Sequence, residues 1–241
     1  HKAIRRQRQM CIRDRIKGDN MKHINIALDG PSGSGKSTIA KELSRKLDIL
    51  YLDTGAMYRA AACKALALGI DTLDEKGVQS FIGDIDLKIV YRNGAQHTYL
   101  DGADVSERIR EPEVSMAASN ISSLRCVRMK MVAMQRDIAK SMSCVLDGRD
   151  IGSFVLPDAR YKFYVTADAK VRTLRRQKEL SAKGFDVGFE QLLQEIEQRD
   201  YNDRHRDFAP LVQAEDAVLI DTSDLSVEEV VNKILSYIER D

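Results

Sequence analysis

A glycine-rich stretch with one lysine and one serine offers the most direct chemistry in this sequence. Gly30 to Ser37 reads Gly-Pro-Ser-Gly-Ser-Gly-Lys-Ser and matches the pattern G-x-x-x-x-G-K-[ST]. In this pattern the glycines let successive backbone N–H groups turn toward a β-phosphate, the lysine reaches the β- and γ-phosphates, and the hydroxyl binds Mg²⁺. The spacing therefore predicts a nucleoside triphosphate site in which Lys36 contacts the phosphates and Ser37 the metal.

The residues on either side of this loop carry the patterns of the strand and helix that must position it. Residues 23–28 are mostly apolar and strand-like, and after the lysine the apolar residues recur at helical spacing, at Ile39, Ala40, Leu43 and Leu47. A helix that begins near Lys36 would direct its partial positive charge toward the phosphates. A plain glycine turn is the other interpretation, but the motif together with both flanking elements favours the phosphate site.

The type of nucleotide is indicated by a motif that the chain lacks. Loops of this kind serve both kinases and nucleotide-dependent switches, and guanine-specific switches normally carry N-K-x-D after a later strand. The sequence contains no such tetrapeptide. ATP is therefore the expected nucleotide, and the class of reaction must be inferred from other residues.

Tyr51 to Arg59 places polar residues directly after a short predicted strand. Asp53 and Thr54 stand at the strand end, and Arg59 lies within the first two turns of the next predicted helix. Ligands of parallel sheets bind outside the carboxyl ends of the strands, so these side chains are candidates for the same crevice as the loop. An ordinary helix cap with a solvated arginine is an equally good interpretation of this stretch alone.

A second strand end has the same composition. Asp147-Gly-Arg149-Asp150 follows the apolar run 144–146. Taken alone, this stretch is also compatible with a charged turn. Two strand ends that each deliver an arginine and a carboxylate are better explained together as parts of one binding crevice.

A third charged stretch runs from Arg199 to Arg206 on and after a predicted helix. Its i,i+4 pairs, Arg199 with Asp203 and Asp200 with Arg204, are compatible with a solvated helix surface. The alternative is a mobile lid whose guanidinium groups close on phosphates, since their planar forks bind phosphate oxygens bidentately. The preceding predicted helix adds Arg172, Arg175 and Arg176.

Strand and helix patterns alternate along most of the chain, which predicts a mostly parallel sheet covered by helices on both faces. Beyond the elements already named, strands are expected at 144–147, 161–165 and 217–220, and helices at 56–68, 74–82, 113–122, 124–140, 168–181, 189–201 and 227–238. Residues 86–100 differ, because their apolar residues alternate around a turn at Asn93-Gly94. We expect this hairpin to be an insertion outside the parallel sheet.

Composition excludes several classes of protein. The 241 residues include 38 Lys and Arg against 37 Asp and Glu, a formal charge of +1, which argues against a protein that binds nucleic acid through many basic groups. No apolar run approaches the roughly 18 residues that span a bilayer, so no membrane role is expected. The four cysteines form no C-x-x-C pair and indicate reduced thiols rather than a zinc site or a disulfide framework.

The charge is unevenly distributed along the chain. Residues 1–20 carry a local charge of +5, and the remainder carries −4. This leader lacks the apolar region of a secretory signal and has few serines for a transit peptide. We expect it to be non-native or disordered, with a natural start at Met21; a basic arm that binds nucleic acid is the alternative.

Four strings in this order resemble bacterial cytidylate kinases, members of the nucleoside monophosphate kinase group: D-G-P-S-G-S-G-K-S-T, Y-L-D-T-G-A-M-Y-R, D-G-R-D-I-G, and R-D-x-x-D-R-x-R followed by A-P-L. The likeness extends from about residue 24 to the C-terminus. It implies one domain over 21–241, with a parallel-sheet core carrying the phosphate loop, a monophosphate-binding insertion at about 84–122 that contains the hairpin, and a helical lid at about 181–209.

The resemblance also implies roles for individual residues. Lys36, Arg149 and Arg206 would be catalytic, and ATP would contact Gly30, Pro31, Ser32, Gly33, Ser34, Gly35, Lys36, Ser37 and Thr38. CMP would contact Thr54, Arg59, Ser119, Arg128, Arg149, Asp150, Arg199, Asp203 and Arg206. Within this set Ser119, Arg128 and Asp150 would face the cytosine ring, where a carboxylate can accept from the N4 amine that uracil lacks.

The implied activity is the ATP-dependent phosphorylation of CMP and dCMP with Mg²⁺, in pyrimidine nucleotide metabolism. The implied enzyme is a cytoplasmic monomer without a nucleic-acid or membrane partner. Another small-molecule kinase with a phosphate loop, of the UMP or shikimate type, is one alternative. A non-catalytic ATP-binding switch is the other.

Overall fold

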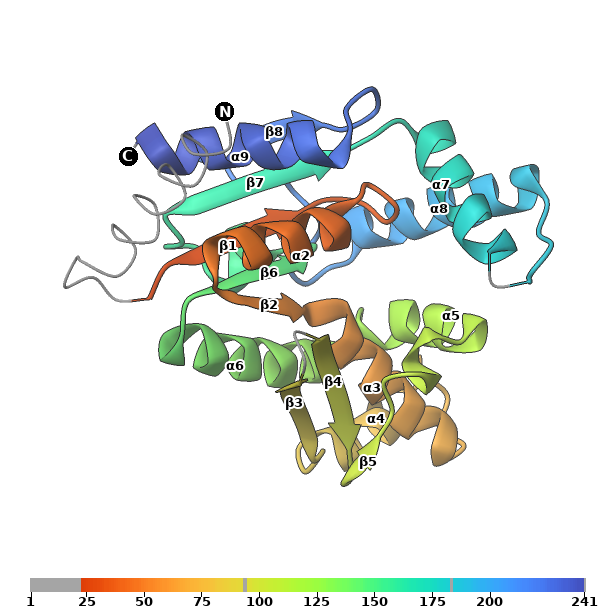
Figure 1. The fold of residues 1–241 in the computed structure, drawn as a ribbon. Coiled ribbons are helices and arrows are strands. Elements are labelled where there is room, and N and C mark those ends of the chain that lie inside the picture. The colour runs from red at the N-terminus through yellow and green to blue at the C-terminus, as the bar shows by residue number, and fades with distance from the viewer. Residues whose placement is uncertain (1–22, 93–94, 183, 241) are drawn as a thin grey trace. The chain divides into compact units, whose positions relative to one another are not determined.

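The computed structural model describes residues 23–92, 95–182 and 184–240 (Figure 1). These residues form two compact units. The first comprises the described residues up to 51 together with those in 139–205 and 209–240, and the second comprises those in 52–138 together with 206–208. The leader expected at 1–20 and the hairpin turn expected at Asn93-Gly94 lie outside the described residues.

A five-stranded sheet forms the centre of the first unit. The strand order is β2-β6-β1-β7-β8, with bounds β1 Asn25–Asp29, β2 Leu50–Asp53, β6 Cys144–Gly148, β7 Tyr161–Thr166 and β8 Val218–Asp221. β1 pairs in parallel with β6 and β7, and β7 pairs in parallel with β8. Because Asp29 is in register with both Gly148 and Tyr164, the segments that follow these strands leave the sheet at one edge.

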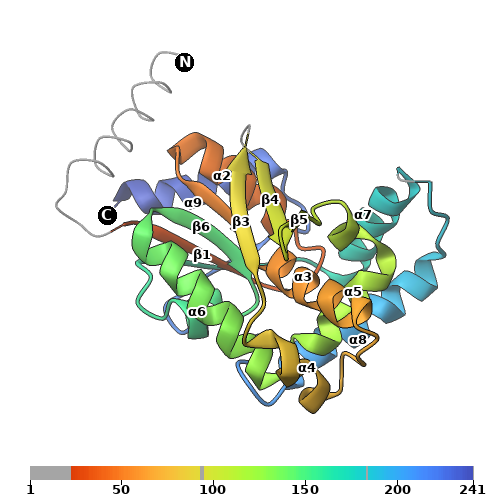
Figure 2. The same cartoon turned by 90° about the horizontal axis from the view of Figure 1, so that it is seen from below.

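Helices α2 (Lys36–Leu47) and α9 (Val227–Arg240) cover one face of this sheet (Figure 2). The apolar stripe expected on α2 is the face that packs inward, as Leu43 joins Phe163 of β7 and Ile234 of α9 in one buried cluster. Burial of each such large side chain contributes about 1.5–3 kcal/mol relative to its exposure. The sequence periodicity of α2 therefore identified its packing face.

The opposite side of β1 is buried as well. Ala27 has no exposed surface, and the short π-helix η2 (Ile151–Val155) contacts β1. A strand buried on both faces explains why residues 26–28 form a continuous apolar run instead of an alternating one.

Two further helices of the first unit, α7 (Ala169–Ser181) and α8 (Phe189–His205), pack against each other. α7 begins after Asp168, whose side chain accepts a hydrogen bond from the backbone N–H of Lys170 at 2.8 Å. Aspartate at this position satisfies one of the unpaired N–H groups of the first helical turn.

The second unit contains a three-stranded antiparallel sheet and several helices. Its strands are β3 (Leu87–Arg92), β4 (Ala95–Leu100) and β5 (Ala103–Asp104), in that order. Its helical elements are α3 (Thr54–Ala67), α4 (Glu75–Ile82), the 3₁₀-helix η1 (Arg108–Arg110), α5 (Pro112–Ile121) and most of α6 (Arg125–Ser141). α3 contacts both α5 and η1.

The fold class expected from the sequence is confirmed. A parallel sheet is flanked by helices, and the hairpin forms a small antiparallel sheet of its own. Three short elements were not predicted, namely β5, η1 and η2, because two to five residues are too few to show a period. Within the part of the chain that the structure describes, no helix is long and apolar enough to cross a membrane.

Candidate active site

The glycine-rich loop joins the end of β1 to the start of α2. Gly30 has a φ of +143°, and a Cβ atom at this position would lie 1.9 Å from the carbonyl oxygen of Val165 in β7. Gly35, directly before α2, has a φ of +89°. Positive φ values are costly for residues with a Cβ atom, and no two unbonded heavy atoms approach to 1.9 Å. The path of the loop beside β7 therefore requires glycine at Gly30.

Side chains from outside the loop hold its carbonyl groups. Arg172 of α7 donates to the carbonyl of Ser32 at 3.0 Å, and the hydroxyl of Thr222, which follows β8, donates to that of Ser34 at 3.0 Å. Arg175 in turn donates to the carbonyl of Thr222 at 2.7 Å. The loop is thus fixed by the protein itself, which favours anion binding because a preorganised site loses little entropy when its ligand arrives.

Lys36 is the first residue of α2, and its ammonium group lies inside the loop. Its Nζ donates to the carbonyl of Pro31 at 2.6 Å and to Oγ of Ser34 at 3.2 Å. Burial, followed by the charge of Arg149, lowers the pKa of Lys36 to about 7. An anion beside this ammonium would raise its pKa again, so Lys36 is a group whose charge responds to phosphate.

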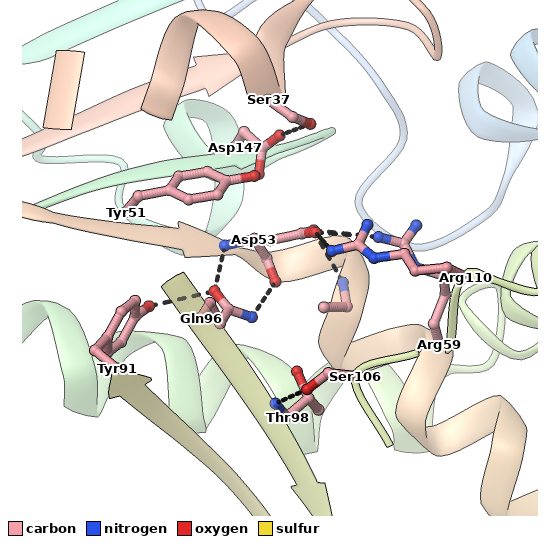
Figure 3. A network of polar contacts seen from close by, with 11 residues as sticks. Ser37, Tyr51, Asp53, Arg59, Tyr91, Gln96, Thr98, Ser106, Arg110 and Asp147 are labelled. Atoms are coloured by element: carbon pink, nitrogen blue, oxygen red, sulfur yellow. Dashed lines mark hydrogen bonds and ion pairs between the residues drawn. The ribbon is translucent and has the colours of Figure 1, made fainter. Parts of the chain in front are cut away.

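Ser37 lies next in α2 and contacts a carboxylate that the sequence placed at a strand end of the expected crevice but without a role of its own. Its Oγ donates to Oδ2 of Asp147 at 2.6 Å, and the hydroxyl of Tyr51 donates to Oδ1 of the same carboxylate at 3.3 Å (Figure 3). Asp147 is buried near the end of β6. The signal in the sequence was a carboxylate directly after a buried apolar strand.

The pair of Ser37 and Asp147 has the chemistry of a magnesium site. Mg²⁺ prefers oxygen ligands and is usually bound by one or two protein groups together with substrate phosphates and water. A hydroxyl beside a carboxylate meets this requirement. The described residues contain no group of three or more His, Cys, Asp or Glu side chains that could hold a metal without such help.

Arg149 and Asp203 form an ion pair in the first unit, between the segment after β6 and α8. Nε of Arg149 lies 2.7 Å from Oδ2 of Asp203, and both side chains are largely buried. Burial opposes the charge of Arg149, but Asp203 outweighs it and raises the pKa of the guanidinium. Asp150, which follows in the chain, is buried at the start of η2.

The charged residues of α8 do not all lie on a solvent-exposed helix surface. Asp200 and Asp203 are both buried, and each forms an ion pair outside its own helix, with Arg172 and with Arg149 respectively. Arg199, on the same helix, is partly buried. The burial of two carboxylates indicates that this end of α8 is specifically bound to α7 and to the segment after β6.

In the second unit, Asp53 organises a cluster of arginines. Its Oδ1 accepts from the backbone N–H of Ala56 at 3.0 Å, which makes Asp53 the N-cap of α3. Its Oδ2 also lies 3.2 Å from Nη2 of Arg59 and 2.8 Å from Nη2 of Arg110 (Figure 3). The helix-cap interpretation was therefore correct for Asp53, but incomplete. Arg110 of η1 was not anticipated, since nothing in its local sequence distinguishes it.

The other expected CMP contacts of the second unit lie on four segments. Thr54 is buried at the start of α3, and Ser119 is partly buried on α5. Arg128 of α6 is only 1% exposed, lies 5.5 Å from the ring of Tyr58 and donates to the carbonyl of Ser122 at 3.3 Å. Arg206 follows α8 in the short segment 206–208 and is partly buried.

The sequence profile of the cytidylate kinase family matches residues 26–240, nearly the whole chain. The chain belongs to the cytidylate kinase family. This confirms the resemblance drawn from the four sequence strings. The match includes the phosphate loop, both strand ends and the charged stretch of α8.

Curated cytidylate kinases are similar over nearly their whole length. That of Caldicellulosiruptor bescii is 51% identical over 215 residues, which are 89% of this chain and 95% of that protein. That of Halalkalibacterium halodurans is 45% identical over 219 residues, 91% of this chain and 99% of that protein. Among solved structures, an uncharacterized protein from Eubacterium ventriosum has a TM-score of 0.52 at 14% identity, covers 91% of this chain and all of its own, and shows likeness of fold alone.

Proposed function

We propose that this member of the cytidylate kinase family transfers the γ-phosphoryl group of ATP to CMP and dCMP, giving CDP or dCDP and ADP. The observation that carries the proposal is the match of the cytidylate kinase profile over residues 26–240. The geometry of the phosphate loop supports it, because a fixed glycine loop, an enclosed lysine and a serine beside a carboxylate are the parts that phosphoryl transfer from a nucleotide requires.

The acceptor oxygen needs no general base. A phosphate monoester is already ionised at neutral pH, so its oxygen can attack the γ-phosphorus without losing a proton first. Catalysis then rests on positioning and on stabilisation of the charge that builds up on the transferred group. We assign this to Lys36, Arg149 and Arg206; arginines in comparable positions of other nucleotide hydrolases contribute roughly 10³–10⁵ in rate.

ATP is proposed to bind residues 30–38, with its phosphates on the backbone N–H groups of the loop and the N-terminus of α2. Mg²⁺, when bound with ATP, supplies positive charge to the phosphate oxygens. Ser37 would be its ligand in the protein, and the neighbouring Asp147 is suited to hold it or its water.

CMP is proposed to be bound by the residues that the family resemblance implies, namely Thr54, Arg59, Ser119, Arg128, Arg149, Asp150, Arg199, Asp203 and Arg206. Guanidinium groups suit the acceptor phosphate, because their planar forks bind its oxygens bidentately. Asp150 would accept from the N4 amine of cytosine and Arg128 would donate to the ring, which together would discriminate against uracil.

Residues 181–209 are proposed to act as a lid. The segment contains α8. Its closure would exclude water from the transferred phosphoryl group and so suppress hydrolysis of ATP. We further propose that the enzyme acts as a cytoplasmic monomer.

A steady-state assay tests the proposal most directly. ADP production is measured with MgATP and, in turn, CMP, dCMP, UMP, AMP and shikimate. We expect kcat/KM to be highest for CMP and dCMP. A preference for UMP, AMP or shikimate would contradict the cytosine assignment, and binding of ATP without any acceptor-dependent ADP would favour a non-catalytic switch.

Replacement of Asp150 tests whether this residue recognises the cytosine base. Asp150→Asn introduces an amide that can donate to O4 of uracil, so we expect the ratio of kcat/KM for CMP to that for UMP to fall by at least about tenfold. Asp158→Asn, at an exposed site after η2, is the control and should leave the ratio unchanged.

A further inference from the structure

The carboxylate of Asp53 holds two arginines from different elements of the second unit. Arg59 lies in α3 and Arg110 in η1, yet both guanidinium groups approach the same oxygen, Oδ2, at 3.2 and 2.8 Å (Figure 3). The other oxygen, Oδ1, accepts the N-cap hydrogen bond from the backbone N–H of Ala56 at 3.0 Å and a longer one from Nη2 of Arg59 at 3.4 Å. Asp53 therefore fixes the start of α3 and the positions of two cationic side chains at once.

The charges of this cluster do not balance. Burial would favour a neutral Asp53, but the two arginines outweigh it and hold the pKa of the carboxyl below its usual value, so the group is ionised at neutral pH. Two guanidinium groups and one carboxylate leave a net charge of +1. Two like charges placed beside one oxygen repel each other, and a bound anion would relieve that repulsion.

The geometry leaves donors for such an anion. The guanidinium of Arg110 has five N–H donors on three nitrogens, and its contact with Asp53 is made through Nη2. The side chain of Arg110 is 48% exposed and that of Arg59 is 18% exposed, so the outer edge of Arg110 is open to a ligand. An ion pair with a half-exposed partner contributes little to the stability of the fold. Stability alone therefore gives a weak reason for placing Arg110 beside Asp53.

A second set of contacts fixes the backbone of Asp53. Gln96 of β4 accepts from the backbone N–H of Asp53 at 2.9 Å and donates to its carbonyl at 3.4 Å. The hydroxyl of Tyr91 in β3 donates to the same amide oxygen of Gln96 at 3.2 Å. The small antiparallel sheet thus holds the backbone of Asp53, and the N-cap hydrogen bond holds its side chain. Together these contacts fix the position of Oδ2.

We propose that Arg110 is a further residue that binds the acceptor phosphate, and that Asp53 is the positioning residue that presents Arg110 and Arg59 to it as a pair. This inference rests on the proposed function, because it takes the anion to be the phosphate of CMP. Two forked guanidinium groups held at a fixed distance match a phosphate group, which offers several oxygens to bidentate donors.

Replacement of Arg110 separates this role from a structural one. Arg110→Ala is compared with Arg108→Ala, which removes an exposed arginine from the same 3₁₀-helix. For Arg110→Ala we expect KM for CMP to rise about 10- to 100-fold with KM for ATP changed less than about twofold. Arg110→Lys should recover part of the loss, since lysine restores the charge without the fork. Arg108→Ala should behave as the wild type.

Replacement of Asp53 tests the positioning role. Asp53→Asn keeps the shape and an acceptor for Ala56 but loses the charge that holds the arginines. We expect it to raise KM for CMP and lower kcat together, and to leave the stabilisation by MgATP, measured as a shift in Tm, unchanged. If this buried variant does not fold, the comparison of Arg110→Ala with Arg108→Ala decides the question alone.

Two results distinguish failure of this inference from failure of the proposed function. If the wild type phosphorylates CMP while Arg110→Ala has the same KM for CMP as Arg108→Ala, the inference is wrong and the function stands. If the wild type produces no ADP with CMP, the function is wrong. Anion binding is then measured as the Tm shift by inorganic phosphate, and a shift equal in Arg110→Ala and Arg108→Ala would overturn the inference as well.

Discussion

Arg172 of α7 and Asp200 of α8 form an ion pair of 2.6 Å in which both side chains are almost completely buried. The same guanidinium donates to the carbonyl of Ser32 in the phosphate loop at 3.0 Å and to that of Ala167 at 3.0 Å. One side chain therefore connects the loop proposed to bind ATP with the helix of the proposed lid. A buried charge that loses its partner is far more destabilising than an exposed one.

We expect Arg172→Ala to lower the free energy of unfolding by about 3–5 kcal/mol, because Asp200 would remain buried without its partner. KM for ATP should also rise, since the carbonyl of Ser32 loses its donor. Urea denaturation and steady-state kinetics measure the two effects. The control is Arg176→Ala on the same helix, which removes an exposed pair with Glu179 and should cost less than about 1 kcal/mol. Equal losses in the two variants would contradict the connecting role of Arg172.

Lys36 should take up a proton when MgATP binds. Its pKa of about 7 leaves it largely neutral at pH 8, and the phosphates should raise that pKa toward its usual value. Calorimetric titration at pH 8 in two buffers with different enthalpies of ionisation should show the uptake of up to about one proton. Lys36→Met should abolish the uptake, and Lys41→Met, at an exposed position of α2, should retain it. Binding without proton uptake by the wild type would show that Lys36 is already charged.

Asp29 should make the stability of the fold fall as the pH rises from about 4 to 7. It accepts hydrogen bonds from the backbone N–H groups of Ile151 and Gly152, both at 2.7 Å, but burial prevails and raises its pKa to about 7. The unfolded chain therefore releases this proton at lower pH than the folded protein, which favours unfolding across that interval.

Urea denaturation at several pH values measures this contribution. Asp29→Asn cannot titrate, so its free energy of unfolding should decline less than that of the wild type between pH 4 and 7. Asp224→Asn, at an exposed site, should follow the wild type. If the free energy of unfolding of the wild type changed over this interval by the same amount as that of Asp29→Asn, the raised pKa would be contradicted.

Ser37 and Asp147 should determine how the enzyme depends on magnesium. We expect Ser37→Ala and Asp147→Asn each to raise the Mg²⁺ concentration for half-maximal activity at least about tenfold, because each removes an oxygen suited to the ion. Tyr51→Phe removes the 3.3 Å hydrogen bond to Asp147 but leaves the carboxylate itself in place, and it should change this concentration less than about threefold. Titration of Mg²⁺ at fixed ATP and CMP is the measurement. An unchanged titration in Ser37→Ala would exclude this serine as a ligand.

The local parts of the structure were predictable, and the contacts between distant segments were not. The stripe of α2 followed from its period, and the phosphate loop followed from its glycines, because both signals lie within a few residues. Asp147 lies 110 positions from Ser37, and Arg110 lies 57 positions from Asp53. No spacing rule links such pairs, since the sheet order and the packing of η1 on α3 bring them together. The expected lid and CMP contacts remain predictions of the resemblance.

The lack of space beside Gly30 has a consequence for how variants of this protein would be interpreted. The backbone of β7 occupies the place of a side chain at this position whether or not a nucleotide is bound. In a survey that scores variants by their abundance in cells, substitutions at Gly30 should therefore be depleted as strongly as those in the hydrophobic core. Substitutions at Ser37 should persist in the same survey and disappear only under selection for growth that depends on the enzyme.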